Sequence, residues 1–102
     1  MSTKGLPDDN VLVVRAGRPG RTGFLARMME DEAEGISVRS TPGMSVEDLA
    51  AGLKGRNMAV TTRGAMRGAG AYLVPEGIPH YLVFPGEGGA TSIADIWWWI
   101  RI

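Results

Sequence analysis

The sequence predicts an α+β domain: a single compact unit with one mixed sheet, short helices and a strand pair near the C-terminus. Short β-branched and aromatic runs alternate with stretches whose apolar residues repeat at helical spacing, and turns rich in glycine or proline separate them. The chain has 102 residues, close to the commonest size of one domain. We expect residues 1–10 to form a flexible lead-in and residues 11–102 to form the domain.

The first third of the chain predicts a strand, a loop and a helix. The β-branched run over 11–15 predicts a strand buried on both faces, and the glycines and proline of 16–23 predict a loop. Residues 24–34 carry apolar side chains on one helical stripe, which predicts a helix with Thr22 as its N-cap. Gly35 supplies the left-handed residue that ends such a helix.

The middle of the chain continues this alternation. Residues 36–39 predict a second strand, and 58–62 a third. Between them, 45–53 predicts a helix because Ser45 begins a capping-box pattern. The small residues of 63–71 predict a short helix or a turn that allows close approach of the backbone.

The last third predicts a strand pair and one ambiguous segment. Residues 72–75 and 80–85 are separated by glycine and Pro79, which indicates two adjacent, antiparallel strands. Within 92–101, apolar residues fall at i, i+3, i+4 and i+7, which favours a helix. Isoleucine and tryptophan are also strong strand formers, so a final strand is the alternative.

Composition narrows the class of function. Eleven basic residues balance eleven acidic ones, which argues against a nucleic-acid partner and against membrane binding through the whole domain. The absence of cysteine excludes a disulfide framework, a cysteine-based zinc site and a thiol nucleophile, and the single histidine argues against a histidine-based metal site. No signal peptide or membrane-length apolar run is present, so a cytoplasmic location is the simplest interpretation.

Two residues are candidates for catalysis. His80, the only histidine, stands where a loop enters a strand, and imidazole is the usual proton carrier near neutral pH. Arg15 ends the first strand ahead of a glycine-rich loop, where a guanidinium can clamp a phosphate. The alternatives are a half-exposed histidine bonded to a carbonyl and a solvated arginine. The catalytic hypothesis requires both side chains to share one solvent-reachable crevice.

Hydroxyl groups extend the predicted nucleotide site. Thr61 and Thr62 end the third strand and can cap the following turn, whose N–H groups suit an anion flanked by Arg63 and Arg67. The hydroxyl of Ser37 can hydrogen-bond the polar edge of a ligand. The alternative is that these are ordinary strand, turn and packing residues.

Three consecutive tryptophans, 97–99, cannot all face one core. Exposed indoles of that area mark interfaces, so we expect Trp98 and Trp99 to contact a protein. The partner is either a second copy of the chain or a cognate antitoxin or immunity protein. Packing under the N-terminal segment is the alternative.

Six short motifs, taken in order over residues 11–84, resemble a loosely defined group of small bacterial proteins and toxin C-terminal modules that are ADP-ribosyltransferase-like. The motifs are VVRAG (13–17), GISV (35–38), SVEDLA (45–50), VTT (60–62), AGAYLVP (69–75) and PHYLV (79–83). The resemblance implies that Arg15 binds a phosphate or ribose of a dinucleotide, that Ser37 supports the pocket and that His80 orients the nucleotide or the acceptor. Such transferases carry a late glutamate, and the only glutamates in that part of this chain, Glu76 and Glu87, fall in predicted loops.

Three functions follow as hypotheses. The first is a toxin-type enzyme of a toxin–antitoxin kind that acts on a nucleotide, with NAD as a candidate substrate and no cofactor assigned. The second is a metal-independent ribonuclease toxin in which His80 moves protons and arginines stabilise the phosphorane charge. The third is a non-catalytic protein-binding module that uses the tryptophan-rich C-terminus.

Overall fold

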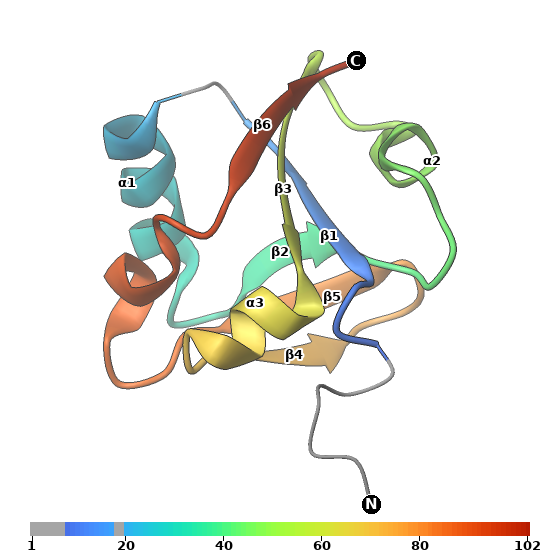
Figure 1. Cartoon of the computed structure of the whole chain (residues 1–102). Helices are drawn as coiled ribbons and strands as arrows, with labels where there is room; N and C mark the ends of the chain where they lie inside the picture. Colours follow the sequence, from blue (N-terminus) through green and yellow to red (C-terminus); the bar gives the residue numbers. More distant parts are fainter. Residues whose placement is uncertain (1–7, 18–19) are drawn as a thin grey trace, which may run out of the picture.

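The computed structural model describes residues 8–17 and 20–102. Six strands form one sheet in the order β4-β5-β2-β1-β3-β6 (Figure 1). The strands are β1 (Leu12–Ala16), β2 (Ile36–Arg39), β3 (Asn57–Thr62), β4 (Tyr72–Pro75), β5 (His80–Phe84) and β6 (Trp98–Arg101). The helices are α1 (Arg21–Asp31), α2 (Val46–Ala50) and α3 (Arg63–Gly68), with a 3₁₀ turn, η1 (Gly89–Ile93). The α+β class is confirmed.

The sheet is antiparallel at every pairing of the described strands, so the prediction of a mixed sheet was wrong. Because β2 and β3 both run antiparallel to β1, they run parallel to each other. The segment that contains α2 therefore leads from the end of β2 back to the edge of the sheet where β2 began, as a crossover connection does. However, β1 lies between the two strands, and no parallel pair forms.

Most predicted elements of the middle of the chain are confirmed. Strands β2 and β4 have the predicted limits, and β4 pairs with β5 as an antiparallel hairpin. The Ser45 hydroxyl accepts a hydrogen bond from the Asp48 N–H at 3.2 Å and so caps α2 as predicted. Thr62 caps α3 in the same way through the Ala65 N–H at 3.1 Å.

Helix α1 begins and ends earlier than predicted. Gly20, not Thr22, is its N-cap, because the Phe24 N–H donates to the Gly20 carbonyl and the first helical turn therefore already contains Thr22. The helix stops at Asp31 and does not reach 34. Gly35 follows with φ of +101°, so the left-handed glycine lies beyond the helix end.

The last four residues of the ambiguous segment 92–101 form a strand, β6, and its first two belong to η1. Pairing with β3 sets Trp99 opposite Ala59 and Trp98 opposite Val60. Because side chains alternate along a strand, Trp98 and Trp99 leave the sheet on opposite faces. The helical spacing of the apolar residues in 92–101 was misleading, since η1 ends at Ile93.

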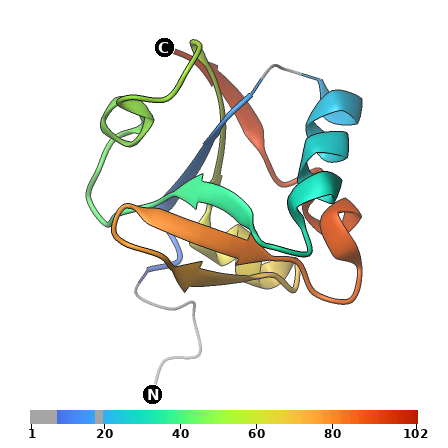
Figure 2. The same ribbon diagram turned by 180° about the vertical axis from the view of Figure 1, so that it is seen from behind.

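The core lies on both faces of the sheet. One face is covered by α1 and η1, which contact each other, and the other face is covered by α2 (Figure 2). Val13 and Val14 in β1 are fully buried on the two opposite faces, as the run at 11–15 predicted. Within the part of the chain that the structure describes, no helix is long and apolar enough to cross a membrane.

The N-terminal segment is described from Asp8 onward. Residues 8–10 of the predicted flexible lead-in form a turn, and residues 1–7 of that prediction lie outside the described residues. The backbone N–H groups of Arg63 and Gly64 donate to the carbonyls of Val11 and Asp9, both at 3.0 Å. The start of α3 therefore rests directly on this turn.

Candidate anion-binding cleft

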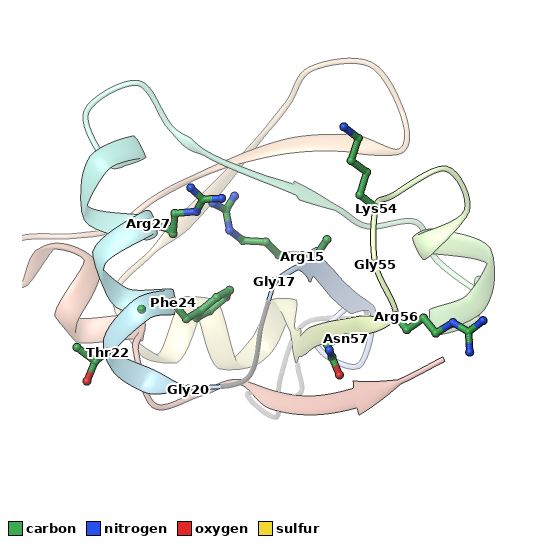
Figure 3. A pocket seen from close by; sticks show the side chains of 12 residues that line it. Arg15, Gly17, Gly20, Thr22, Phe24, Arg27, Lys54, Gly55, Arg56 and Asn57 are labelled. Carbon is green, nitrogen blue, oxygen red and sulfur yellow. The ribbon is translucent and has the colours of Figure 1, made fainter.

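A cleft of about 1040 Å³ opens between the start of α1 and the loop that leads into β3 (Figure 3). We call it the basic cleft because four basic side chains line it, and no acidic residue is among its described lining residues. The four are Arg15, Arg27, Lys54 and Arg56. The cleft begins beyond the end of β1, where the sequence predicted a crevice at Arg15.

Strand alternation directs Arg15 toward α1. Val14 packs on the side of α2, so the next residue leaves the sheet on the side of α1. The Arg15 side chain is 15% exposed. Its Nη1 donates to the Ser37 carbonyl oxygen at 2.8 Å, and its Nη2 donates to Asp31 Oδ2 at 3.0 Å. The guanidinium is therefore held in place at the edge of the cleft.

Buried aromatic packing fixes the wall of the cleft that α1 forms. Phe24 is 6% exposed and meets the rings of Trp97 and Trp99 edge-on, with centroids 5.3 and 5.0 Å apart. Arg27 lies one turn later on the same helix. In Figure 3 its guanidinium reaches toward that of Arg15.

The loop before β3 forms the other wall. It carries Lys54 and Arg56, and it is tied to β1 because the Gly17 N–H donates to the Asn57 carbonyl at 3.2 Å. Among the described residues, Arg27, Lys54 and Arg56 form no ion pair. In Figure 3 the Lys54 and Arg56 side chains extend away from Arg15 and Arg27, so the positive charge is spread along the cleft. Basic side chains along one cleft without a counterion make an anionic ligand favourable there.

A second group of charges, the Asp8 cluster (Asp8, Asp9, Arg63 and Arg67), lies at the start of α3. The sequence predicted an anion between Arg63 and Arg67, and in the structure the chain supplies it. Arg63 Nη1 donates to Asp8 Oδ2 at 3.1 Å, Arg67 Nη2 donates to Asp8 Oδ1 at 2.6 Å, and Arg67 also bonds Asp9. These arginines are therefore occupied in the free protein.

Arg63 is the buried centre of the Asp8 cluster. Its Nε donates to Ser40 Oγ at 2.9 Å, and its guanidinium lies 4.8 Å from the centre of the Tyr81 ring. The hydrogen bond from Arg63 lowers the pKa of the Asp8 carboxyl, and Arg67 adds to that effect, while burial acts in the opposite direction. The hydrogen bond to Asp9 raises the pKa of Arg67.

The predicted threonine ligands do not line the basic cleft. The buried Thr61 hydroxyl donates to the Ile96 carbonyl at 2.8 Å, which ties β3 to the segment before β6. Thr62 caps α3, as described above. Their role in nucleotide binding stays a prediction, and both hydroxyls already have a partner within the chain.

Strand register places the side chains of His80 and Ser37 on the face of the sheet opposite the Arg15 guanidinium, although the Ser37 carbonyl accepts a hydrogen bond from Arg15. Arg39 lies opposite both Val14 and His80, so His80 emerges on the face of α2, and Ser37 shares that face because it lies two residues from Arg39. Arg15, Ser37 and His80 do border one smaller hollow of about 230 Å³, as the sequence predicted. However, the Arg15 guanidinium is hydrogen-bonded to Asp31 on the side of α1. In this position it faces a ligand in the basic cleft rather than one beside His80.

The two predicted interface tryptophans differ in exposure. Trp98 is 43% exposed on the outermost strand. Trp99 packs against Phe24 and the core and is half-buried. Of these two tryptophans, Trp98 therefore offers the larger surface to a protein partner.

Sequence reasoning found Arg15 but missed Arg27, Lys54 and Arg56. Arg27 lies on the polar side of the predicted helix, and the other two lie in a glycine-containing turn, so each looked like a solvated surface residue. Only the approach of that turn to α1 brings them together. No protein family, curated protein or solved structure was found to match this chain.

Proposed function

We propose that this protein binds a phosphate-bearing nucleotide, such as the dinucleotide NAD, in the basic cleft and acts in the cytoplasm. One observation carries the proposal: Arg15 and three basic side chains without an ion pair among the described residues line one cleft. Guanidinium groups match the geometry of phosphate oxygens and bind them by two parallel hydrogen bonds.

The size and lining of the cleft suit a ligand larger than a single phosphate. Its volume of about 1040 Å³ lies at the upper end of the range of ligand pockets, roughly 300–1000 Å³. Thr22 and Asn57 add a hydroxyl and an amide to the lining, which can hydrogen-bond ribose or base. Arg15 and Arg27 are the residues that we assign to phosphate.

The toxin-type chemistry stays a prediction that depends on this binding. The glutamates that the transferase resemblance would use, Glu76 and Glu87, do not line the basic cleft. The carboxylate nearest to the Arg15 guanidinium is that of Asp31. The proposal is therefore one of nucleotide binding, and any transfer step would need a carboxylate that the bound ligand reaches.

Calorimetric titration tests the proposal. We expect ADP and NAD to bind the wild-type protein, and Arg27→Ala to weaken ADP binding about tenfold, because one charge-assisted contact is lost. Arg101→Ala is the matched control, since Arg101 is exposed on β6 and outside the cleft. Equal affinities of the two variants, or no binding at millimolar nucleotide, would overturn the proposal.

A second function, self-association through β6, is favoured by the edge position of that strand. Trp98, Ile100 and Ile102 alternate onto one side, and Trp98 and Ile102 are 43% and 38% exposed. Antiparallel pairing of two β6 strands about Ile100 would set Trp98 opposite the partner's Ile102, which makes the row self-complementary.

Sedimentation over a concentration series tests self-association. We expect Trp98→Lys to abolish the dimer, because it places a charge in the apolar row. Tyr72→Lys is the matched control, since Tyr72 is 56% exposed on β4 at the opposite edge of the sheet. A wild-type protein that stays monomeric at high concentration would refute the assignment.

A further inference from the structure

Asp31 occupies the anion position beside Arg15. Its Oδ2 lies 3.0 Å from Arg15 Nη2, and its side chain is 46% exposed whereas that of Arg15 is 15% exposed. The carboxylate therefore meets the guanidinium from the solvent side. An incoming phosphate would approach the same nitrogen from that direction.

Helix geometry places Asp31 on the same face of α1 as the second arginine of the cleft. Arg27 and Asp31 are four residues apart on α1, so they lie on one face of the helix. The guanidinium of Arg27 reaches toward that of Arg15 in Figure 3. A ligand phosphate that bound both arginines would therefore compete with the Asp31 carboxylate for Arg15 Nη2.

Asp31 is poorly suited to a purely structural role. It is the last residue of α1, where the helix dipole disfavours a negative charge, and the last turn holds no basic residue. Arg15 does not depend on it for orientation, because the Ser37 carbonyl accepts a separate hydrogen bond of 2.8 Å from Nη1. Loss of the carboxylate would leave the guanidinium held and its second nitrogen available.

We infer that Asp31 is an internal competitor for the anion site, displaced from Arg15 when a ligand binds. This inference rests on the proposed function and names the ligand class more closely. A monocarboxylate brings no more charge than the Asp31 carboxylate that it replaces. A phosphate group carries up to two charges and three acceptor oxygens, so the site selects ligands with two or more phosphate charges over monocarboxylates.

The test compares two variants that each remove one negative charge from α1. Asp31→Asn keeps the shape and an oxygen acceptor but removes the competing charge. Glu30→Gln removes a charge from the adjacent exposed residue, which, unlike Asp31, is not bonded to Arg15. Titration with ADP and with inorganic pyrophosphate at low salt should show about fivefold to tenfold tighter binding to Asp31→Asn, and less than twofold change for Glu30→Gln.

Acetate gives a second readout. Every anion must displace the same carboxylate, so acetate should also bind Asp31→Asn more tightly than the wild-type protein, by a factor similar to that for ADP. A merely structural role of Asp31 predicts no tightening of either ligand. Thermal unfolding checks that each variant keeps the fold. We expect little change in the melting temperature, because exposed ion pairs contribute little to stability.

The outcomes separate the inference from the proposed function. Weaker ADP binding by Asp31→Asn, with the wild type still binding, would mean that Asp31 positions Arg15, and the inference alone would be overturned. Equal tightening by both variants would assign the effect to overall charge and would also overturn it. No ADP binding by either the wild type or Asp31→Asn would overturn the proposed function and the inference together.

Discussion

The Asp8 cluster and the basic cleft are built from the same kind of side chain but differ in their counterions. In the Asp8 cluster, each arginine bonds an aspartate of the N-terminal turn. In the basic cleft, Arg15 alone has an ion pair among the described residues. Both arginines of the Asp8 cluster are therefore engaged within the chain, whereas the basic cleft offers three basic side chains without an ion pair, and Arg15 once Asp31 is displaced.

Burial sharpens the difference between these two regions. Arg63 is 9% exposed, and it contacts a hydroxyl, a carboxylate and an aromatic ring at once. Arg27, Lys54 and Arg56 are exposed. Substitutions in the Asp8 cluster should therefore change stability, and substitutions in the basic cleft should change binding.

The largest effect is expected from Arg63→Ala. The variant removes the donor to Ser40 and Asp8, and we expect the free energy of unfolding to fall by about 2–3 kcal/mol. The value is below that of a fully buried pair because Asp8 is 37% exposed and because Arg63 Nη2 is buried without a partner. Urea denaturation measures it, with exposed Arg101→Ala as control. A loss below 1 kcal/mol would place Arg63 among ordinary surface residues.

Gly64→Ala is expected to be the next most damaging change. An added Cβ would lie 2.9 Å from both the Cβ and the carbonyl oxygen of Asp9, so the N-terminal turn would have to move. Overpacking of this kind costs about 1–3 kcal/mol. Gly68→Ala is the matched control, because no atom lies within 4 Å of its added Cβ and alanine favours helix. Equal urea midpoints for the two variants would show that the turn does not pack on α3 as described.

How far the sequence predicts this fold depends on the distance over which each signal acts. The Ser45 and Thr62 caps and the β4–β5 hairpin involve residues close in the chain, and their patterns predicted them correctly. The segment that became β6 carried two competing local patterns. Its pairing with β3, some forty residues away, settled the conflict, and no local spacing encodes that pairing.

The candidate site shows the same limit. Arg15 was predictable because its place at a strand end before a glycine-rich loop is a local feature. Lys54 became a cleft residue only because the loop before β3 lies opposite α1. In the same way, Asp8 and Arg63 are 55 residues apart in the chain, and no local pattern indicates their contact. The sequence therefore predicted a site for an external anion at a place where Asp8 already supplies the negative charge.

A smaller, pH-dependent effect is expected from Asp8→Asn. Arg63 and Arg67 hold the pKa of the Asp8 carboxyl below its ordinary value of 3.8. The ionised carboxylate therefore stabilises the fold above about pH 4, and this contribution is lost as the pH falls through the lowered pKa. We expect Asp8→Asn to lose about 1 kcal/mol at pH 7, because the side chain is partly exposed.

Urea denaturation at pH 7 and at several values below pH 4 measures this effect. The unfolding free energy of Asp8→Asn should fall less steeply with acid than that of the wild type. Parallel curves for the two proteins would mean that the Asp8–Arg63 contact contributes no pH dependence.

The smallest effect is expected from His80→Ala, although His80 was the leading catalytic candidate in the sequence. His80 is exposed on the face of α2, while the Arg15 guanidinium is bonded on the face of α1. We expect the unfolding free energy to change by less than about 0.5 kcal/mol, as for most exposed residues. We also expect ADP affinity to stay within twofold of wild type, whereas Arg15→Ala should weaken it at least tenfold. A tenfold loss in His80→Ala would instead show that the ligand enters the smaller hollow over β1, β2 and β5. The phosphate site would then have to be assigned to that face of the sheet.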